Sequence, residues 1–191
     1  MARLKKKEVR DAILASAATL FMQNGYIGTT IAAIARGAGT SSSGVYIYFS
    51  SKIEIAFAVF DPWMRDRMDA LQRDVDAQPD PAAQLDRLVI GLLRDIAADR
   101  SGQTLTLVQA LATAKPTDEY SPELLIWTEE RLGEMLGKIL LHVDPSVLKT
   151  LRRSLMLAFD GIALRQNLRQ TDFGEIDEVN ALVRAVMRQK G

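Results

Sequence analysis

The 191-residue sequence predicts an all-α fold of about nine helices, and two observations lead to this class. Apolar residues recur at spacings of three and four through most of the chain, which is the period of an amphipathic helix. Capping and helix-breaking residues separate these periodic runs, and no segment shows the alternation typical of a half-buried strand. A composition with 48% hydrophobic and 25% charged residues suits a globular chain of one domain or two small ones.

The N-terminal region predicts two helices followed by a tight turn. The first helix spans 8–24 and ends at Gly25, a residue type that commonly follows a helix. In the second, Ile31 and Ile34 lie on one apolar face. The two glycines within 37–39 then predict a sharp turn, because glycine tolerates a positive φ.

A third helix is expected over 42–49, with Ser41 as its N-cap and with Val45 and Phe49 on one face. A short second helix with small polar residues at its tip is what reading the major groove of DNA requires. The next helix begins at 52, where the sequence 51–54 matches a capping box. The segment therefore predicts a three-helix, helix-turn-helix domain over 1–52.

The order and spacing of these residues resemble the N-terminal signature of TetR/AcrR-type transcriptional regulators. The residues that carry the resemblance are Gly25-Tyr26, Thr29-Thr30, Ile34-Ala35, Gly39, Ser41, Tyr46, Tyr48-Phe49 and Ser51-Lys52. The likeness covers roughly residues 8–57, about a quarter of the chain. It implies a homodimer that binds double-stranded DNA through its N-terminal domain and a small-molecule effector through a helical domain over 53–191.

The resemblance also implies which side chains face DNA. These are Thr30, Ser42, Ser43, Gly44, Tyr46, Tyr48 and Lys52. The chain departs from the family at Ala32 and Ala33, where many members carry a charged pair. Its recognition helix also lacks Arg, Asn and Gln, the residue types that read G or A through two hydrogen bonds. Specificity is therefore expected to depend on tyrosine contacts, thymine methyl groups and DNA shape.

The charge distribution agrees with DNA binding at one end. Residues 1–54 hold seven Lys/Arg and three Asp/Glu, although the whole chain has no net charge. The remainder holds 17 basic and 21 acidic residues. A basic head on an acidic body is expected when only one end meets phosphate.

Five further helices precede the C-terminal one. The fourth contains Pro62, where a kink is favoured over a break because the apolar pattern resumes at once. Helices follow over about 82–100, 103–113 and 123–142. The next begins near Pro145 and has two apolar faces, so one is expected to pack inside the subunit and the other against a second chain. A ninth helix begins after 172–175.

The family pairs its subunits through its last two long helices, which assigns a dimer interface here. Its predicted residues are Leu157, Gly161, Leu164, Leu168, Val179, Val183 and Val186. The resemblance likewise implies a ligand cavity in the helical body, for a small and largely apolar effector. Its candidate residues are Trp63, Met64, Met68, Ile96, Gln109, Trp127 and Phe159, each of which also suits an ordinary core position.

The sequence offers no catalytic or metal-binding motif. It lacks cysteine, and its only histidine, His142, suits a helix end better than a general base or metal ligand. No cofactor is expected. No stretch approaches the roughly 20 apolar residues of a membrane span, so a cytoplasmic location without a membrane partner is predicted.

These features predict a ligand-responsive repressor that binds a pseudo-palindromic operator as a dimer and is released by its effector, not an enzyme. The alternatives are an activator, a regulator without a ligand, and a helical module that binds another protein.

Overall fold

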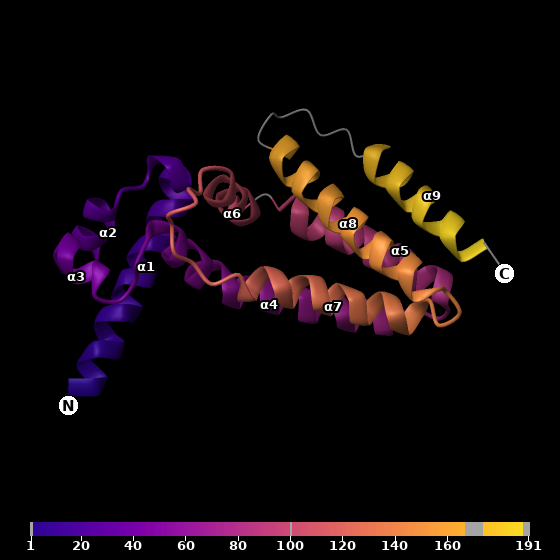
Figure 1. Ribbon diagram of the computed structural model, residues 1–191, viewed down its shortest axis with the longest axis horizontal. Helices are drawn as coiled ribbons and strands as arrows, with labels where there is room; N and C mark the ends of the chain where they lie inside the picture. Colours follow the sequence, from indigo (N-terminus) through magenta and orange to yellow (C-terminus); the bar gives the residue numbers. More distant parts are fainter. Residues whose placement is uncertain (1, 100, 167–173, 189–191) are drawn as a thin grey trace. The chain divides into compact units, whose positions relative to one another are not determined.

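The computed structural model describes residues 2–99, 101–166 and 174–188, with side chains described for 6–99, 101–165 and 176–185. Every regular element in these ranges is helical, which confirms the predicted class and the expected nine α-helices (Figure 1). The elements are α1 (Ala2–Gly28), α2 (Ile31–Gly37), α3 (Ser42–Tyr46), α4 (Lys52–Asp76), α5 (Pro81–Ile90), η1 (Gly91–Ala97), α6 (Gln103–Ala112), α7 (Glu123–Ile139), α8 (Pro145–Gln166) and α9 (Gly174–Arg188).

The chain divides into two compact units. The first unit comprises Met1–Trp63 and Arg100–Leu124, and the second comprises Met64–Asp99 and Leu125–Gly191. The first unit therefore takes in α6, which packs against α1 although the two helices are far apart in sequence. The boundary at 52/53 was predicted between functional domains and stays a prediction, whereas these units are defined by packing alone.

Gly25 and Thr29 shape the end of α1. Gly25 has a φ of 68° and interrupts the helix, as expected of a glycine at this position. Thr29 is buried, and its hydroxyl donates to the carbonyl oxygens of Leu20 and Gly25 at 3.1 and 2.8 Å. The Thr29 side chain thus holds the chain against the last turns of α1 at the point where it turns towards α2.

The turn between α2 and α3 forms as the glycine pattern predicts. Gly39 has a φ of 66°, and the amide of Thr40 donates to the carbonyl of Ala35 at 2.9 Å. Gly37 is required for a second reason, because a Cβ there would collide with the hydroxyl of Ser16. That hydroxyl donates to the carbonyl of Ile34 at 2.9 Å and joins α1 to α2.

The start of α4 is capped from two neighbouring serines. The Ser51 hydroxyl accepts from the amide of Glu54 at 3.1 Å, while the Glu54 carboxylate accepts from the amide of Ser50. In a standard capping box the Glu54 carboxylate would accept from the amide of Ser51. Here it accepts from the preceding amide, that of Ser50. Helix α4 continues through Pro62, so the proline does not end the helix.

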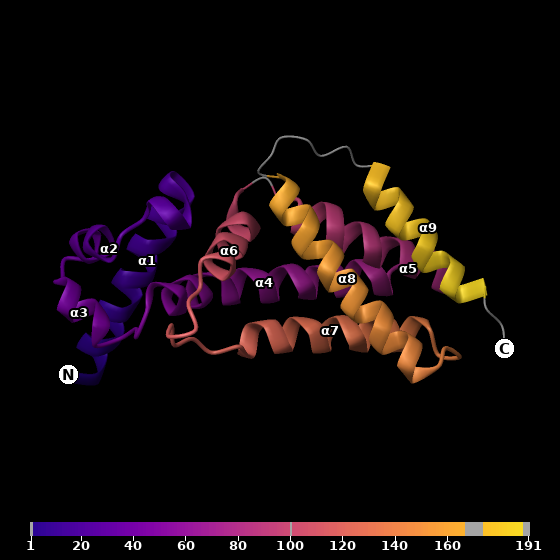
Figure 2. The same cartoon turned by 45° about the horizontal axis from the view of Figure 1, so that its top comes forward.

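In the second unit α9 packs along α5, and α8 packs against η1 (Figure 2). The predicted single helix over 82–100 is instead α5 followed by the π-helical segment η1. Gly91, the first residue of η1, is buried where a Cβ would collide with Leu71. Close packing against α4 thus explains this glycine. Within the described residues, no helix is both long and apolar enough to cross a membrane.

Candidate nucleic-acid interface

Helix α3 presents one buried face and one solvent face. Val45 of α3 and Phe49, three residues beyond the end of the helix, are 0% and 2% exposed and fix this segment on the first unit. The Ser41 hydroxyl caps the helix by accepting from the amide of Gly44 at 3.0 Å. Since the core anchors one side and a cap holds the N-terminus, the outward side chains are held on a rigid support.

The side chains predicted to face DNA are mostly on this outer surface. Thr30, Ser42, Ser43 and Tyr46 are exposed, whereas Gly44, Tyr48 and Lys52 are half-buried. The Thr30 hydroxyl accepts from the amide of Ala33 at 3.1 Å and so caps α2, which leaves its proton available to a phosphate oxygen. The sequence pattern thus identified a set of residues whose placement is compatible with DNA contact.

Lys52 is more engaged than the sequence suggested. Its ammonium group donates to the carbonyl oxygens of Tyr26 and Thr29 at 2.8 and 2.9 Å. It also lies 4.1 Å from the centroid of the Tyr26 ring. Burial lowers the pKa of Lys52 from its ordinary value. Two of its three donors thus hold the protein together, which leaves at most one for a phosphate.

Tyr26 is a buried residue at the centre of this region. Burial and the negative charge of Asp118 raise its pKa to about 12. Its amide donates to Oε1 of Gln109 at 3.2 Å, so α6 supplies a partner for the end of α1. Gln109 was predicted to bind a ligand, but in the structure its side-chain oxygen accepts this backbone hydrogen bond.

The segment that follows α6 is attached to the start of α4. The hydroxyl of Ser51 donates to the carbonyl of Glu119 at 2.7 Å. The rings of Phe57 and Tyr120 stack with their centroids 5.2 Å apart. These contacts place 119–120 in the first unit beside the capped end of α4, an arrangement that no local sequence signal indicated.

Two residues near the recognition helix were missed by the sequence reasoning. Ile47 follows α3 directly and is 74% exposed. The guanidinium of Arg10 lies 5.1 Å from the centroid of the Phe49 ring, so this basic residue of α1 lies against the base of α3. Helical periodicity counted from Val45 would have placed Ile47 on the outer face.

The predicted ligand residues are divided between the two units. Trp63 and Gln109 belong to the first unit, and the other five belong to the second. Met64, Met68, Ile96 and Phe159 are between 0% and 4% exposed. Trp127 is half-buried, and the guanidinium of Arg65 lies 4.4 Å from the centroid of its ring. These placements suit core residues, and their role in ligand binding stays a prediction.

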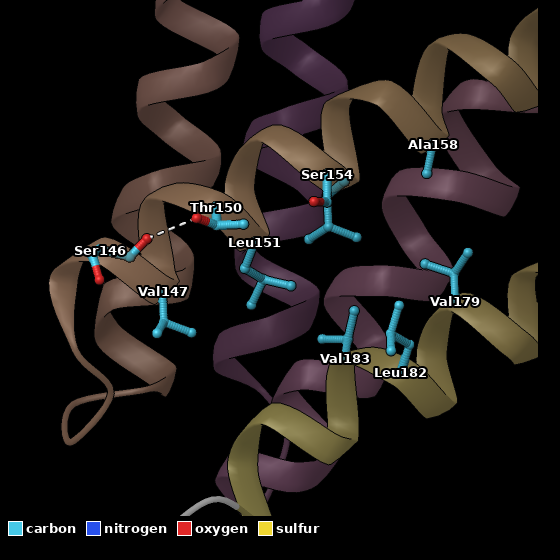
Figure 3. A pocket seen from close by; sticks show the side chains of 10 residues that line it. Ser146, Val147, Thr150, Leu151, Ser154, Ala158, Val179, Leu182 and Val183 are labelled. Carbon is cyan, nitrogen blue, oxygen red and sulfur yellow. Dashed lines mark hydrogen bonds between the residues drawn. The ribbon is translucent and has the colours of Figure 1, made fainter.

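An apolar groove of about 460 Å³ lies between α8 and α9 of the second unit (Figure 3). Its walls include Leu151 and Leu155 from α8 and Val179, Leu182 and Val183 from α9. The groove thus contains two residues of the predicted dimer interface, Val179 and Val183, the second of which is only 2% exposed.

The other predicted interface residues that the structure describes do not line the groove. Leu157 and Leu164 are 72% and 49% exposed, and nothing lies within 4 Å of the position a Cβ on Gly161 would take. Leu168 and the side chain of Val186 lie outside the described residues.

Comparison with known proteins supports this reading of the first unit. Residues 13–59 match the family model described as bacterial regulatory proteins, tetR family. Among curated proteins none matches the chain.

Solved structures extend the likeness to the whole fold. A TetR transcriptional regulator from Rhodococcus sp. RHA1 superposes with a TM-score of 0.66 at 16% identity, over 98% of this chain and all of that one (100%). PfmR from Thermus thermophilus gives 0.55 at 22% identity, over 95% and 98%. FadR from Bacillus subtilis, solved with stearoyl-CoA, gives 0.61 at 15% identity, over 94% and 98%.

A capped, outward-facing α3 within a segment that matches a family of bacterial regulatory proteins is typical of a DNA-binding transcriptional regulator. The matched segment shows a tetR family DNA-binding domain at residues 13–59, and the whole chain shares its fold with solved TetR family regulators. This family acts by binding DNA and not by catalysis.

Proposed function

We propose that the chain is a repressor that binds a pseudo-palindromic operator as a homodimer and is released by a small, largely apolar effector. In this proposal residues 1–52 bind DNA, and residues 53–191 bind the effector and form the dimer. The protein acts in the cytoplasm. The observation that carries the proposal is the coexistence of an outward-facing recognition helix with an uncovered apolar surface on α8 and α9.

The apolar surface supports pairing with a second copy of the chain. Leu157 and Leu164 on α8 and Leu182 on α9 are 72%, 49% and 71% exposed, and the α8–α9 groove lies on the same two helices. Apolar side chains exposed beside an apolar groove are typical of an interface that a partner covers. A glycine at 161 with open space around it allows a neighbouring helix to approach closely.

A dimer fits the geometry of DNA recognition. Two recognition helices related by a two-fold axis enter successive major grooves when their half-sites lie about one helical turn apart. Replacing Leu157 by Arg should convert the dimer into a monomer and weaken operator binding sharply, because each monomer contacts one half-site. Leu141→Arg is the matched control, since Leu141 is 74% exposed and lies outside α8. Analytical ultracentrifugation measures the oligomeric state, and a dimer that persists in Leu157→Arg contradicts this interface.

The effector proposal rests on the apolar character of the second unit. Met64, Met68, Ile96 and Phe159 supply apolar side chains of the kind that line small-molecule sites. FadR from Bacillus subtilis, which shares the fold, was solved with stearoyl-CoA. This likeness makes stearoyl-CoA and its free fatty acid reasonable first probes.

The experiment is a fluorescence-anisotropy titration of the protein with its own upstream DNA and with a scrambled duplex at two salt concentrations. Tight binding that depends on sequence and weakens with salt is expected. Addition of stearoyl-CoA or stearate should then dissociate the complex if either belongs to the effector class. An effector can shift this equilibrium only if it binds the free and DNA-bound states with different affinities. Equal weak binding to both duplexes would contradict the proposed operator.

A further inference from the structure

The orientation of α3 identifies the residue that faces directly away from the protein. The helix turns by about 100° per residue, so Ile47 lies about 200° from buried Val45 and Ser43 lies about 160° on the other side. Ile47 keeps helical backbone angles, with φ of −70° and ψ of −25°, and its amide donates to the carbonyl of Gly44 at 3.3 Å. Ile47 and Ser43 therefore form the outermost line of the recognition helix.

The chemistry of this line is mainly apolar. Ile47 is 74% exposed, more than the neighbouring Tyr46 at 55%. The Ser43 hydroxyl is 2.9 Å from that of Ser41, so part of its hydrogen-bonding capacity is used within the protein. Tyr46 precedes Ile47 and lies about 100° to one side of it on the helix. The residue best placed to touch the floor of a groove is thus a branched aliphatic side chain.

The major groove offers one apolar group, the C5-methyl of thymine. We propose that Ile47 is a specificity-determining residue that reads a thymine methyl group in each half-site. The inference depends on operator binding by the first unit and adds which base feature is recognised. An aliphatic contact distinguishes thymine from bases that lack this methyl group, which compensates for the absence of side chains that read G or A with two hydrogen bonds.

The test uses full-length protein and duplexes selected by it from a random library. Each thymine of the selected site is replaced in turn by deoxyuridine, which removes only the C5-methyl group. For the wild-type protein, at least one replacement should raise Kd about fourfold, the factor that corresponds to one buried methyl-sized group. The Ile47→Ala variant should bind the thymine duplex more weakly and show no further loss with deoxyuridine at that position.

Two variants control the comparison. Ile47→Val keeps a branched aliphatic contact and should retain sensitivity to deoxyuridine. Leu141→Ala removes an equally exposed aliphatic side chain from the second unit and should leave both Kd values unchanged. Circular dichroism should show native helix content for all variants, because both sites are 74% exposed.

The outcomes are distinct. Ile47 is not the reader if Ile47→Ala retains the full deoxyuridine penalty, or if no thymine is sensitive in the wild-type protein. A library that yields no enriched sequence would instead overturn sequence-specific binding by the protein, and the role of Ile47 with it.

Discussion

The ammonium group of Lys52 lies over the ring of Tyr26, 4.1 Å from its centroid, and donates to the carbonyl oxygen of the same residue at 2.8 Å. One residue at the start of α4 thus contacts both the side chain and the backbone at the end of α1. Sequence reasoning assigned Lys52 to a DNA phosphate, whereas the structure gives it a structural role as well.

Replacing Lys52 by Met should therefore destabilise the protein. The change keeps the aliphatic stem but removes a cation–π contact and two hydrogen bonds to carbonyl oxygens. Because the site is only half-buried, the free energy of unfolding should fall by about 1–2 kcal/mol. Urea denaturation measures the change, and Lys115→Met, an exposed lysine of the same unit, should cause little loss.

The third donor of Lys52 predicts an effect on DNA binding that is separable from stability. If it contacts a phosphate, Lys52→Met should lower affinity on all sequences by a similar factor. The slope of log K against log salt should also become shallower by about one unit. An unchanged slope under conditions where the variant is fully folded would restrict Lys52 to its structural role.

Tyr26 should make the protein sensitive to alkaline pH. Its pKa is about 12 in the folded protein, compared with 10.0 for an ordinary tyrosine. Between these values the unfolded chain loses the proton while the folded chain keeps it, so rising pH favours unfolding. The contribution is complete below pH 10 and disappears towards pH 12. Near-ultraviolet absorbance, followed as pH rises, should show one tyrosine that ionises well above pH 10, and Tyr26→Phe should remove that step. If Tyr26→Phe instead removes a tyrosine that ionises near pH 10, the assignment is wrong.

Tyr46 should contribute affinity with little selectivity. Its side chain is 55% exposed, and its hydroxyl can donate to a phosphate oxygen. Tyr46→Phe should raise Kd about two- to tenfold, the range for one lost hydrogen bond. The loss should be similar for the operator and for mismatched duplexes in competition binding. A loss confined to the operator would mean that Tyr46 reads a base.

Two glycine-to-alanine changes should alter the free energy of unfolding in opposite directions. Gly39 has a φ of 66° and nothing near its missing Cβ, so Gly39→Ala should destabilise the protein by about 1 kcal/mol through backbone strain alone. Gly137 lies inside α7, also with open space, so Gly137→Ala should stabilise that helix by roughly 0.5–1 kcal/mol. Chemical denaturation monitored by circular dichroism measures both free energies of unfolding. A Gly39→Ala variant as stable as the wild type, or more stable, would contradict backbone strain at Gly39.

The sequence predicted those features that arise from local signals. The breaks at Gly25 and Gly39, the N-cap at Ser41 and the start of α4 at Lys52 each depend on residues within one helical turn. These signals were sufficient for the helix-turn-helix region and for the order of the helices, because each helix carries its own apolar stripe and capping residues.

Other features depend on contacts that local patterns do not encode. The bond between Gln109 and the amide of Tyr26 joins residues 83 positions apart. The π-helical geometry of η1 rests on i→i+5 hydrogen bonds that no residue type in the segment marks, so a continuous α-helix was expected there. Ile47 was missed for a different reason. The candidate DNA contacts were chosen among side chains that form hydrogen bonds, and Ile47 is an apolar residue on the same surface of the helix.

The hydrogen bond from Tyr26 to Gln109 has a practical consequence for protein engineering. The unit that contains the recognition helix is assembled from two separate stretches of chain, Met1–Trp63 and Arg100–Leu124. If residues 1–63 alone were fused to the C-terminal domain of another regulator, the amide of Tyr26 would lose its acceptor on Gln109. The ring of Phe57 would also lose its stacking partner, Tyr120. Chimaeric regulators with exchanged operator preference should therefore transfer both stretches together.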